Sequence, residues 1–514
     1  MSESQWTDEL EKNDPGIRVP EKTEKPMGAA QNQSEDHKAV DINPLRANEE
    51  PVDEKNISLQ QHLEGKTQQT GNSEINEEVK MVHEGAIQSD HENQQHSDER
   101  DNPGQKNGQR KELSNKEITD HTANLWKYLP IPKNEPDPAP EYKVSDLIYP
   151  GSKVVAARVR GKKHKHEGSN CDDWFETAFF GDVTFAAVSD GAGSKKFSRV
   201  GAKESCRAAV GYLINEYPKL LEETAGLREH VQLPLTDEKC ISACRRIAVL
   251  VQHSVLKARE AVEAAFYSRS LSPAYAELLG RNLALEDLSG TLLVSAIVPV
   301  RKETKEHLIV TCQVGDGMTA SINSKGAYLS SVKLLGVPDS GEFTGETEFL
   351  TSKKIKNVEE LQKRTKLFLG PVDTVLMMSD GVADDYYPNE TQMRRLYFDL
   401  IANEILHQEG EKKSLADLDA EQMSLFKKIP DPISYPWVND KSVMVPIQYT
   451  KNICESMNLS LETLWNHREI LELAALEVKR KTDVVSDAEK LKQWLDSYYE
   501  RGSFDDRTLV MIEL

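Results

Sequence analysis

Short apolar runs of strand length recur through the later two-thirds of the chain, and longer stretches with helical spacing lie among them. The first runs cover residues 154–159 and 183–187, and each has the length of a buried strand. Further runs of this kind are found at residues 292–298, 307–311, 318–322 and 508–512. Together they predict a folded domain, rich in β-strands, that begins near Glu141.

The helical stretches separate these runs. Apolar residues recur at near-helical spacing between residues 199 and 217, and residues 240–267 carry a similar apolar face. A long, mostly helical insertion is expected at about residues 386–500, with helices near residues 391–406, 461–479 and 487–499. The insertion lies between two predicted strands, so it is either a lid or partner surface near the site or a plain helical addition.

The first 140 residues differ in composition from the rest. They are rich in Glu, Asn, Gln, Asp, Lys and Ser, and their only aromatic residues are Trp6, Trp126 and Tyr128. Such a segment cannot bury enough apolar surface to fold, so residues 1–140 are predicted to be a disordered tail and linker, and residues 141–514 the folded domain. Within the tail, residues 125–132 are either a docking motif or a linker that packs loosely on the domain, and residues 135–140 suggest a stiff, extended linker.

The charge balance narrows the class of protein. The 514 residues carry a net charge of −21, which argues against binding to nucleic acid but is compatible with binding metal cations. The N-terminus has no apolar core of a signal peptide, and no apolar run approaches the roughly 18 residues of a membrane span. The six cysteines lack the spacing of a disulfide framework or a zinc site. We therefore expect a cytoplasmic protein with reduced thiols and no contact with membranes.

Acidic residues flank the predicted strands at four places. Asp190, Asp316 and Asp380 each follow an apolar run and precede a glycine, and the pair Asp505–Asp506 opens the last strand. A neighbouring glycine lets the backbone approach a ligand closely. Because magnesium and manganese prefer oxygen ligands, four strands that end in carboxylates indicate a site for a hard cation.

A basic segment precedes one more acidic pair, Asp172–Asp173. Residues 160–166 are mostly Arg, Lys and His. They form either a solvated turn or a phosphate-binding site. Their position just before the acidic pair suggests the second possibility.

In this order, the motifs resemble those of the metal-dependent protein phosphatases, the type 2C or PPM family, and above all a bacterial branch with an Asp-Gly-Ala-Gly-Ser motif. The first motif of that branch is similar to His164, Gly168, Cys171 and Asp173. The other motifs are matched by residues 190–194, 289–291, 314–316 and 379–382 and by the closing Asp505, Asp506 and Thr508. The resemblance covers roughly residues 150–390 and the last ten or so residues.

The resemblance implies an α+β fold in which two packed, mainly antiparallel β-sheets are flanked by helices, an α-β-β-α sandwich preceded by the disordered N-terminal region. It also implies two Mn²⁺ or Mg²⁺ ions bridged by Asp190. The remaining implied ligands are the backbone carbonyl of Gly191 and the side chains of Asp173, Asp380 and Asp505, with Asp316 for a third ion. Asp172 and Asp506 stay open as alternatives within their pairs.

The activity that the resemblance implies is that of a protein serine/threonine phosphatase. A metal-activated water would hydrolyse the phosphoserine or phosphothreonine monoesters of a phosphoprotein substrate. A Ser/Thr kinase is a further expected partner. Asp190, Asp380 and His164 are the candidate catalytic residues.

Two positions depart from the family pattern. Many relatives hold the substrate phosphate with an Arg shortly before the first acidic motif, and the candidates here are Arg158, Arg160 and Lys162. Some relatives carry a His after the Asp-Gly of the second motif as a proton donor. Ala192 stands at that position, which leaves water or a histidine of the basic segment to protonate the leaving group.

Two other functions compete with this one. A pseudophosphatase would keep the fold as a catalytically inactive binding and regulatory module, but all the expected carboxylates are present. A calcium-binding or purely structural acidic domain is less consistent with the sequence, because the Asp residues lack the short spacing of an EF-hand loop.

Overall fold

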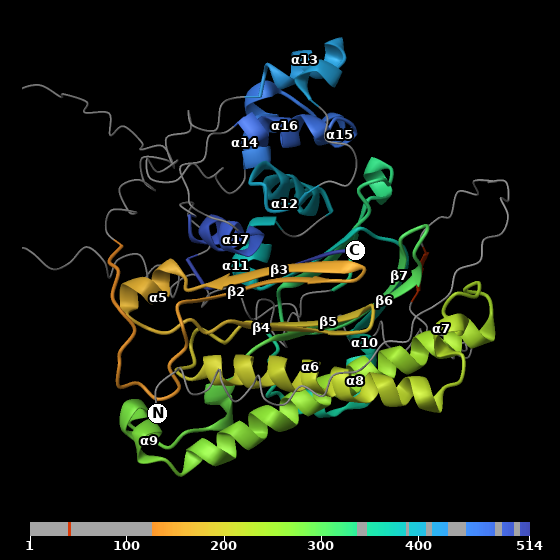
Figure 1. Ribbon diagram of the computed structural model, residues 1–514. Coiled ribbons are helices and arrows are strands. Elements are labelled where there is room, and N and C mark those ends of the chain that lie inside the picture. The colour runs from red at the N-terminus through yellow and green to blue at the C-terminus, as the bar shows by residue number, and fades with distance from the viewer. Residues whose placement is uncertain are drawn as a thin grey trace, which may run out of the picture. The chain divides into compact units, whose positions relative to one another are not determined.

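Two antiparallel β-sheets face each other at the centre of the computed structural model, and helices cover both outer faces (Figure 1). The structure describes residues 40–42, 126–336, 347–386, 390–407, 414–429, 449–477, 486–497 and 504–514. All of these residues belong to one unit, Ala39–Leu514. The α+β sandwich that the sequence predicts is confirmed.

The first sheet contains six strands within the described part of the chain. Their order is β1 (Val40–Ile42), β10 (Thr365–Pro371), β7 (Glu306–Val314), β6 (Leu292–Arg301), β5 (Val183–Ser189) and β4 (Trp174–Phe180). Alternate residues of β5 belong to different cores. Phe185 and Ala187 pack toward the helices, whereas Ala186 and Val188 pack between the two sheets. Because both faces of β5 are covered, its sequence is a continuous apolar run rather than an alternating one.

The second sheet also has six strands in the described ranges. Their order is β2 (Tyr142–Tyr149), β3 (Ser152–Val159), β12 (Arg507–Glu513), β11 (Thr374–Met378), β8 (Met318–Ile322) and β9 (Val332–Leu334). The last strand of the chain lies in the middle of this sheet, with Val510 opposite both Ala156 and Met377. This long-range pairing brings the C-terminal carboxylates among the strand ends of the earlier sequence.

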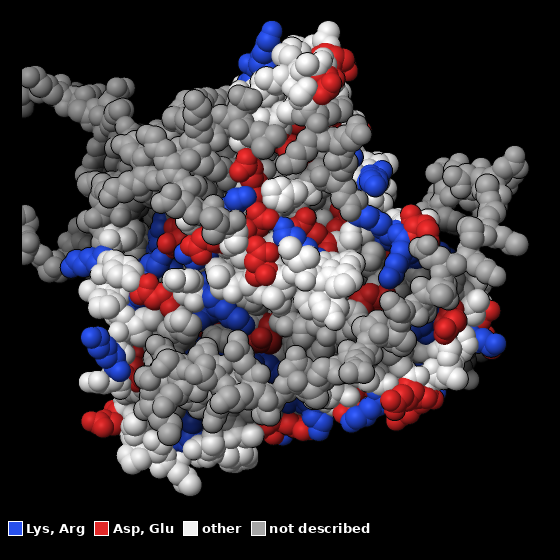
Figure 2. Space-filling model, in the orientation of Figure 1, with Lys and Arg blue, Asp and Glu red and all other residues white. Residues whose placement is uncertain are grey.

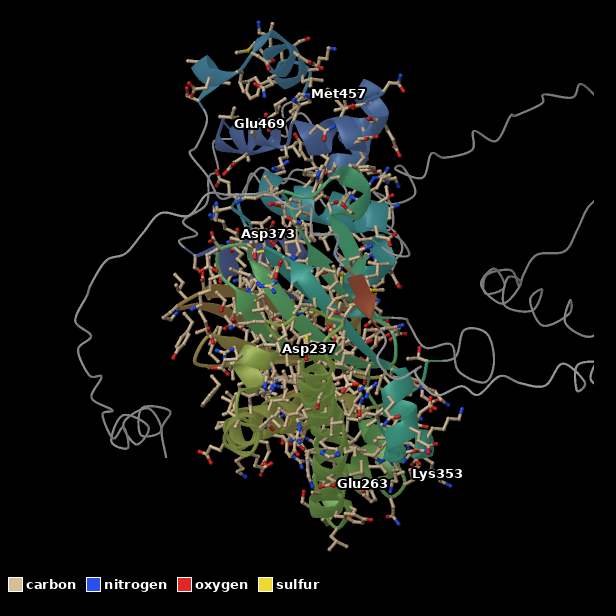
Figure 3. All side chains as sticks on the ribbon, turned by 90° about the vertical axis from the view of Figure 1, so that its right-hand side faces the viewer. Asp237, Glu263, Lys353, Asp373, Met457 and Glu469 are labelled. Atoms are coloured by element: carbon tan, nitrogen blue, oxygen red, sulfur yellow. The ribbon has the colours of Figure 1, made fainter. Side chains whose placement is uncertain are left out.

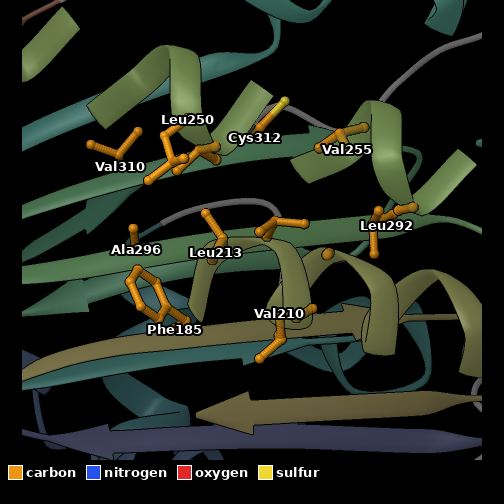
Figure 4. Close-up of a cluster of buried hydrophobic side chains, with 14 of the residues drawn as sticks. Phe185, Val210, Leu213, Leu250, Val255, Leu292, Ala296, Val310 and Cys312 are labelled. Atoms are coloured by element: carbon orange, nitrogen blue, oxygen red, sulfur yellow. The ribbon is translucent and has the colours of Figure 1, made fainter. Parts of the chain in front are cut away.

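Two long helices cover the first sheet, as the sequence predicts. They are α6 (Ser198–Glu223) and α8 (Glu238–Ser270), and both run a few residues beyond the predicted stretches. Leu213 of α6 and Leu250 of α8 pack in one apolar cluster with Phe185 of β5 (Figure 4). This cluster fixes the helices on the outer face of the first sheet.

Shorter helices cover the second sheet and make up most of the predicted insertion. They are α11 (Asp380–Tyr386), α12 (Glu390–Ala402), α13 (Ala420–Phe426), α14 (Tyr449–Met457), α15 (Leu461–Asn466), α16 (Glu469–Glu477) and α17 (Asp487–Asp496). The single helix predicted at residues 461–479 is two helices, because the backbone leaves the helical conformation at His467. Met457 and Glu469 of this group lie on the opposite side of the sheets from Glu263 of α8 (Figure 3).

The basic segment at residues 160–166 is not a loop. Lys162–Glu167 form the short helix α5, which ends at Gly168 with a φ of 73°. Glycine favours this left-handed conformation at a helix C-terminus because it has no Cβ atom. Arg160 and His164 are only 1% and 3% exposed. The segment is therefore a packed part of the domain rather than a solvated turn.

Residues 126–141 lie against the domain, and we call them the N-terminal strap. The backbone N–H of Leu129 donates a hydrogen bond to Lys165 O of α5 (2.7 Å), and Glu135 is only 6% exposed. Contact with the domain thus begins before Glu141, where the sequence predicts the domain to start. Of the predicted tail before the strap, Val40–Ile42 pair with β10, and the remainder lies outside the described residues.

Asp487, at the start of α17, links the insertion to the second sheet. Its carboxylate oxygens lie 2.5 Å from Lys153 Nζ of β3, 3.0 Å from Lys490 Nζ and 3.3 Å from His407 Nε2. Burial alone would raise the pKa of Asp487, but hydrogen bonds from His407, Lys153 and Lys490 hold this pKa well below its usual value.

Replacing Asp487 by Asn should lower the free energy of unfolding at pH 7 by about 1 kcal/mol, because partly exposed ion pairs each contribute little. Since the folded-state pKa is lowered, the stabilisation is present above the unfolded-state pKa of about 3.9 and is lost as the pH falls further toward the folded-state value. Urea unfolding of both proteins between pH 7 and pH 3 measures the difference. The control is Glu489→Gln, which removes one ion pair, to Lys492, on the same helix. An equal loss of stability in both variants would contradict the role given to Asp487.

Candidate metal centre

Strand pairing brings the acidic segments to one edge of the sandwich. β4 begins directly after Asp173, and its partner β5 ends directly before Asp190. In the second sheet, β12 begins after Asp505–Asp506, and its partner β11 ends two residues before Asp380. Asp316 follows the end of β7. Because the strands of each pair are antiparallel, the end of one lies beside the start of the other, and the carboxylates converge.

Two groups of side chains are close enough to hold a cation. The ligand atoms of Asp190, Asp316 and Asp380 all lie within 4.8 Å of one another. A second group within the same limit is His164, Asp505 and Asp506. Three of the predicted metal ligands therefore meet directly, and Asp505 lies in the neighbouring group.

Several carboxylate oxygens in the cluster are buried without a hydrogen-bond donor. Oδ2 of Asp173 accepts hydrogen bonds from Ser379 Oγ (2.8 Å) and Thr508 Oγ1 (2.6 Å). In contrast, Oδ1 of Asp316 and Oδ1 of Asp380 are buried and have no hydrogen-bond partner among the described residues. Buried oxygen atoms rarely lack a hydrogen-bond partner, and a bound cation would supply a partner for both of these oxygens.

Burial and mutual repulsion raise the pKa values of the clustered carboxyl groups. Burial raises the pKa of Asp190 well above its usual value, and the charges of Asp380 and Asp173 raise it further. Burial, followed by the charges of Asp316 and Asp173, raises the pKa of Asp380 to about 8. Burial and the charge of Asp506 raise the pKa of Asp173 to about 6. Such a cluster keeps its charges only beside cations, so these residues fit a divalent metal site.

The backbone around Asp190 and Gly191 is closely packed. A Cβ atom on Gly191 would lie 2.6 Å from Asp172 O and 2.9 Å from Ser198 Oγ, so only glycine fits. Thr291 holds the other side: its N–H donates to Asp190 O (2.8 Å), and its Oγ1 accepts from Asp190 N (2.9 Å). The sequence alone indicates no role for the motif Ser289-Gly290-Thr291. In the structure, its Thr291 fixes the backbone of Asp190.

Asp506 and His164 form a buried pair beside the cluster. His164 Nδ1 lies 2.9 Å from Asp506 Oδ2. Asp506 also accepts hydrogen bonds from the backbone N–H groups of Gly161 (2.6 Å) and Asp172 (2.5 Å). Burial alone would lower the pKa of His164, but the charge of Asp506 raises it to about 9. Asp506 thus joins α5 to the segment before β4.

The cations predicted to hold phosphate lie mostly inside the protein. Arg158 and Arg160 are 0% and 1% exposed. Arg158 donates a hydrogen bond to the carbonyl of Pro140, and Arg160 donates one to the carbonyl of Leu129, both in the N-terminal strap. Burial lowers the pKa of Lys162 to about 8. A phosphate-binding role does not fit Arg158 and Arg160, because neither guanidinium group reaches solvent.

Two residues near the cluster were not assigned to the site from the sequence. A Cβ atom placed on Gly193 would lie 3.8 Å from Lys163 Nζ and 4.0 Å from Asp505 Oδ2, so the amine lies beside the acidic cluster. Asp384 lies one helical turn after Asp380 in α11, and burial and the charge of Asp316 raise its pKa. Asp384 could have been found from the sequence, because it follows Asp380 by four residues after a predicted strand.

Residues 160–418 match the family model of protein phosphatase 2C, and this stretch is half of the chain. The chain therefore belongs to the protein phosphatase 2C family, as its motifs predict. Among solved structures, it is similar to RsbX in complex with magnesium, with 11% identity, a TM-score of 0.30, and coverage of 72% of this chain and 100% of that chain. It is also similar to the serine/threonine phosphatase Stp1 from Staphylococcus aureus, with 12% identity, a TM-score of 0.31, and coverage of 74% of this chain and 97% of that chain. No curated protein matches the chain.

Replacing Thr508 by Val should weaken metal binding about tenfold, because Asp173 loses one of the hydrogen bonds that orient its carboxylate. Titration calorimetry with Mn²⁺ measures the dissociation constant. The matched control is Thr311→Val, since the Thr311 hydroxyl donates a similar buried hydrogen bond to Leu335 O (2.6 Å), away from the carboxylates. Equal Mn²⁺ affinity in the two variants would contradict the orienting role of Thr508.

Proposed function

We propose that this protein is a metal-dependent protein serine/threonine phosphatase. The observation that carries the proposal is the cluster of Asp190, Asp316 and Asp380, whose ligand atoms lie within 4.8 Å of one another. Membership of the protein phosphatase 2C family supports a phosphoprotein as the substrate class.

The metal site that we propose holds two Mn²⁺ or Mg²⁺ ions on oxygen ligands alone. The proposed ligands are the carbonyl of Gly191 and the side chains of Asp173, Asp190, Asp380 and Asp505, with Asp316 for a third ion. Carboxylate and carbonyl oxygens are the donors that these hard cations prefer. When bound, such ions lower the pKa of a coordinated water and offset the charge of the phosphoryl oxygens.

A cysteine nucleophile does not fit the site. All six cysteines are buried. Burial raises the pKa of Cys171, which lies two residues before Asp173, well above its usual value. A thiol that stays protonated is a poor nucleophile, so we assign the attack on phosphorus to water.

Solvent water is also the proposed proton donor to the leaving serine or threonine oxygen. Ala192 stands where some relatives carry a histidine, and His164 is only 3% exposed, with Nδ1 against Asp506. We therefore assign His164 to positioning rather than to proton transfer. Through Asp506, it helps to hold the backbone of Asp172, next to the ligand Asp173.

Lys163 is the proposed ligand for the substrate phosphate. Its backbone N–H donates a hydrogen bond to Phe504 O (2.9 Å), which fixes α5 beside the segment of Asp505. Its amine lies near Gly193, on the same side as the Asp505 carboxylate. A lysine ammonium in this place offers a point charge for a phosphate oxygen, whereas the buried Arg158 and Arg160 cannot reach one.

The described surface shows charges of both signs. Figure 2 shows acidic and basic side chains interspersed on the described part of one face. That nucleic acid is not a ligand remains a prediction from the net charge of −21. Within the described ranges, no helix has both the length and the apolar character needed to cross a lipid bilayer.

A Ser/Thr kinase partner remains a prediction from the family resemblance.

Hydrolysis of an aryl phosphate tests the catalytic proposal. The wild-type protein should turn the substrate over with Mn²⁺ or Mg²⁺ and not with a chelator. Asp190→Asn should reduce kcat/KM by about 100-fold or more, because this carboxylate is the proposed ligand shared by both ions. The control is Asp146→Asn, an exposed aspartate of β2, which should keep full activity. Folded wild-type protein without activity in either metal would contradict the proposal and favour an inactive binding module.

Replacing Lys163 by Met should raise KM for the aryl phosphate about tenfold with a smaller change in kcat, because a contact made in both ground and transition states is lost. Steady-state kinetics at saturating Mn²⁺ measures both constants. Lys165→Met is the matched control on the same helix, since the Lys165 amine pairs with Asp496 instead. If KM is the same in the two variants, Lys163 does not bind the phosphate.

A further inference from the structure

The N-terminal strap contacts three segments that carry proposed metal ligands. We propose that the strap positions these ligands and thereby sets the metal affinity of the site, with Glu135 and Trp126 as its positioning residues. The inference rests on the proposed metal site. It concerns residues 126–141, which lie before the family match at residues 160–418.

Asn170 connects the strap to the first ligand segment. It lies three residues before Asp173 and is 1% exposed. Its Nδ2 donates a hydrogen bond to Glu135 Oε2 (2.8 Å), and its Oδ1 accepts one from the N–H of Ala139 (2.8 Å). Both ends of this amide are therefore held by the strap, and the turn that leads to Asp173 cannot shift without breaking these bonds.

Glu135 also connects the strap to the second ligand segment. Its Oε1 lies 3.1 Å from Lys196 Nζ and 3.5 Å from Arg199 Nη2. Lys196 lies in the loop between Asp190 and α6, and Arg199 lies in the first turn of α6. Because Glu135 is only 6% exposed, its carboxylate is surrounded mainly by these two cations and Asn170 rather than by solvent. One strap carboxylate thus ties the Asp173 segment to the Asp190 loop.

Trp126 connects the strap to the third ligand segment. Its ring lies 4.7 Å, centroid to centroid, from the ring of Phe504, the residue before Asp505. It also meets the ring of His166 edge-on at 5.3 Å. The next backbone N–H, that of Lys127, donates to His166 Nδ1 (3.0 Å). The aromatic contact therefore restrains the loop of Asp505 against α5.

Asp137 anchors the strap away from the site. Its carboxylate accepts hydrogen bonds from Arg269 Nε (2.7 Å) and Nη2 (3.0 Å) and from the hydroxyl of Tyr275. Its carbonyl accepts one from Arg199 Nε (2.7 Å). Its φ of 50° is uncommon for a residue other than glycine, and these contacts hold it there. The strap is thus fixed at its middle, and from this anchored position it contacts the three ligand segments.

Calorimetric titration of the full chain with Mn²⁺ tests this inference, with Glu135→Ala and Trp126→Ala as the variants. The Mn²⁺ dissociation constant should rise about tenfold in each, as is typical when a group that orients a ligand is lost. At saturating Mn²⁺, kcat should stay within about a factor of two of wild type. Trp126→Phe should recover most of the affinity, because a ring remains to contact Phe504.

Glu263→Ala is the control variant. It removes a charged contact that can affect the stability of the protein but not the metal ligands. Glu263 pairs with Arg259 (3.2 Å) and Lys356 (3.0 Å) in the last third of α8 (Figure 3), and neither partner belongs to the strap. This variant should keep the wild-type Mn²⁺ dissociation constant.

Two results would overturn the inference. One is an unchanged dissociation constant in both folded strap variants. The other is a loss of kcat at saturating Mn²⁺ with unchanged affinity, which would mean that the strap acts on the substrate. A wild-type protein that binds Mn²⁺ but hydrolyses no phosphate ester would end the proposed function and leave the calorimetric comparison intact, so the two failures are distinguishable.

Discussion

Repulsion between buried carboxylates is the constraint on which the rest of the structure depends. Asp173 is buried, Asp190 and Asp380 lie close to it and are partly buried, and burial raises the pKa of each. Without a counter-charge, such groups would take up protons or move apart. They cannot move far, because each lies within two residues of a strand end that is fixed in an antiparallel ladder. A divalent cation removes the repulsion, so metal binding and the stability of this edge are coupled.

Contacts outside the carboxylate cluster also hold its members in place. Thr508 of β12 and Ser379, the residue directly after β11, orient the carboxylate of Asp173. Thr291, directly before β6 of the first sheet, fixes the backbone of Asp190. Through Asn170, the N-terminal strap restrains the turn before Asp173. Each contact reduces the freedom of one proposed metal ligand, and together they hold the carboxylates of the cluster in place.

The strands and the acidic residues at their ends could be predicted because both are local signals, whereas the two-sheet sandwich was implied by the resemblance of the motifs to a known family. Apolar runs mark buried strands, and a carboxylate directly beside such a run must lie at a sheet edge. The positions of Arg158 and Arg160 could not be predicted in this way, since basic residues are usually exposed and these two depend on carbonyls of the strap. The same holds for His164, whose partner Asp506 is almost at the other end of the chain. Burial of a charge is decided by distant partners, which no local pattern reveals.

Anomalous diffraction from crystals grown with Mn²⁺ tests the central claim most directly, because it locates the ions without relying on activity. We expect two manganese peaks about 3.5–4 Å apart. They should lie on either side of the Asp190 carboxylate, within bonding distance of Asp173, Asp380 and Asp505. Manganese found only elsewhere on a folded protein, or no manganese at saturating concentration, would contradict the claim that this carboxylate cluster is a metal centre.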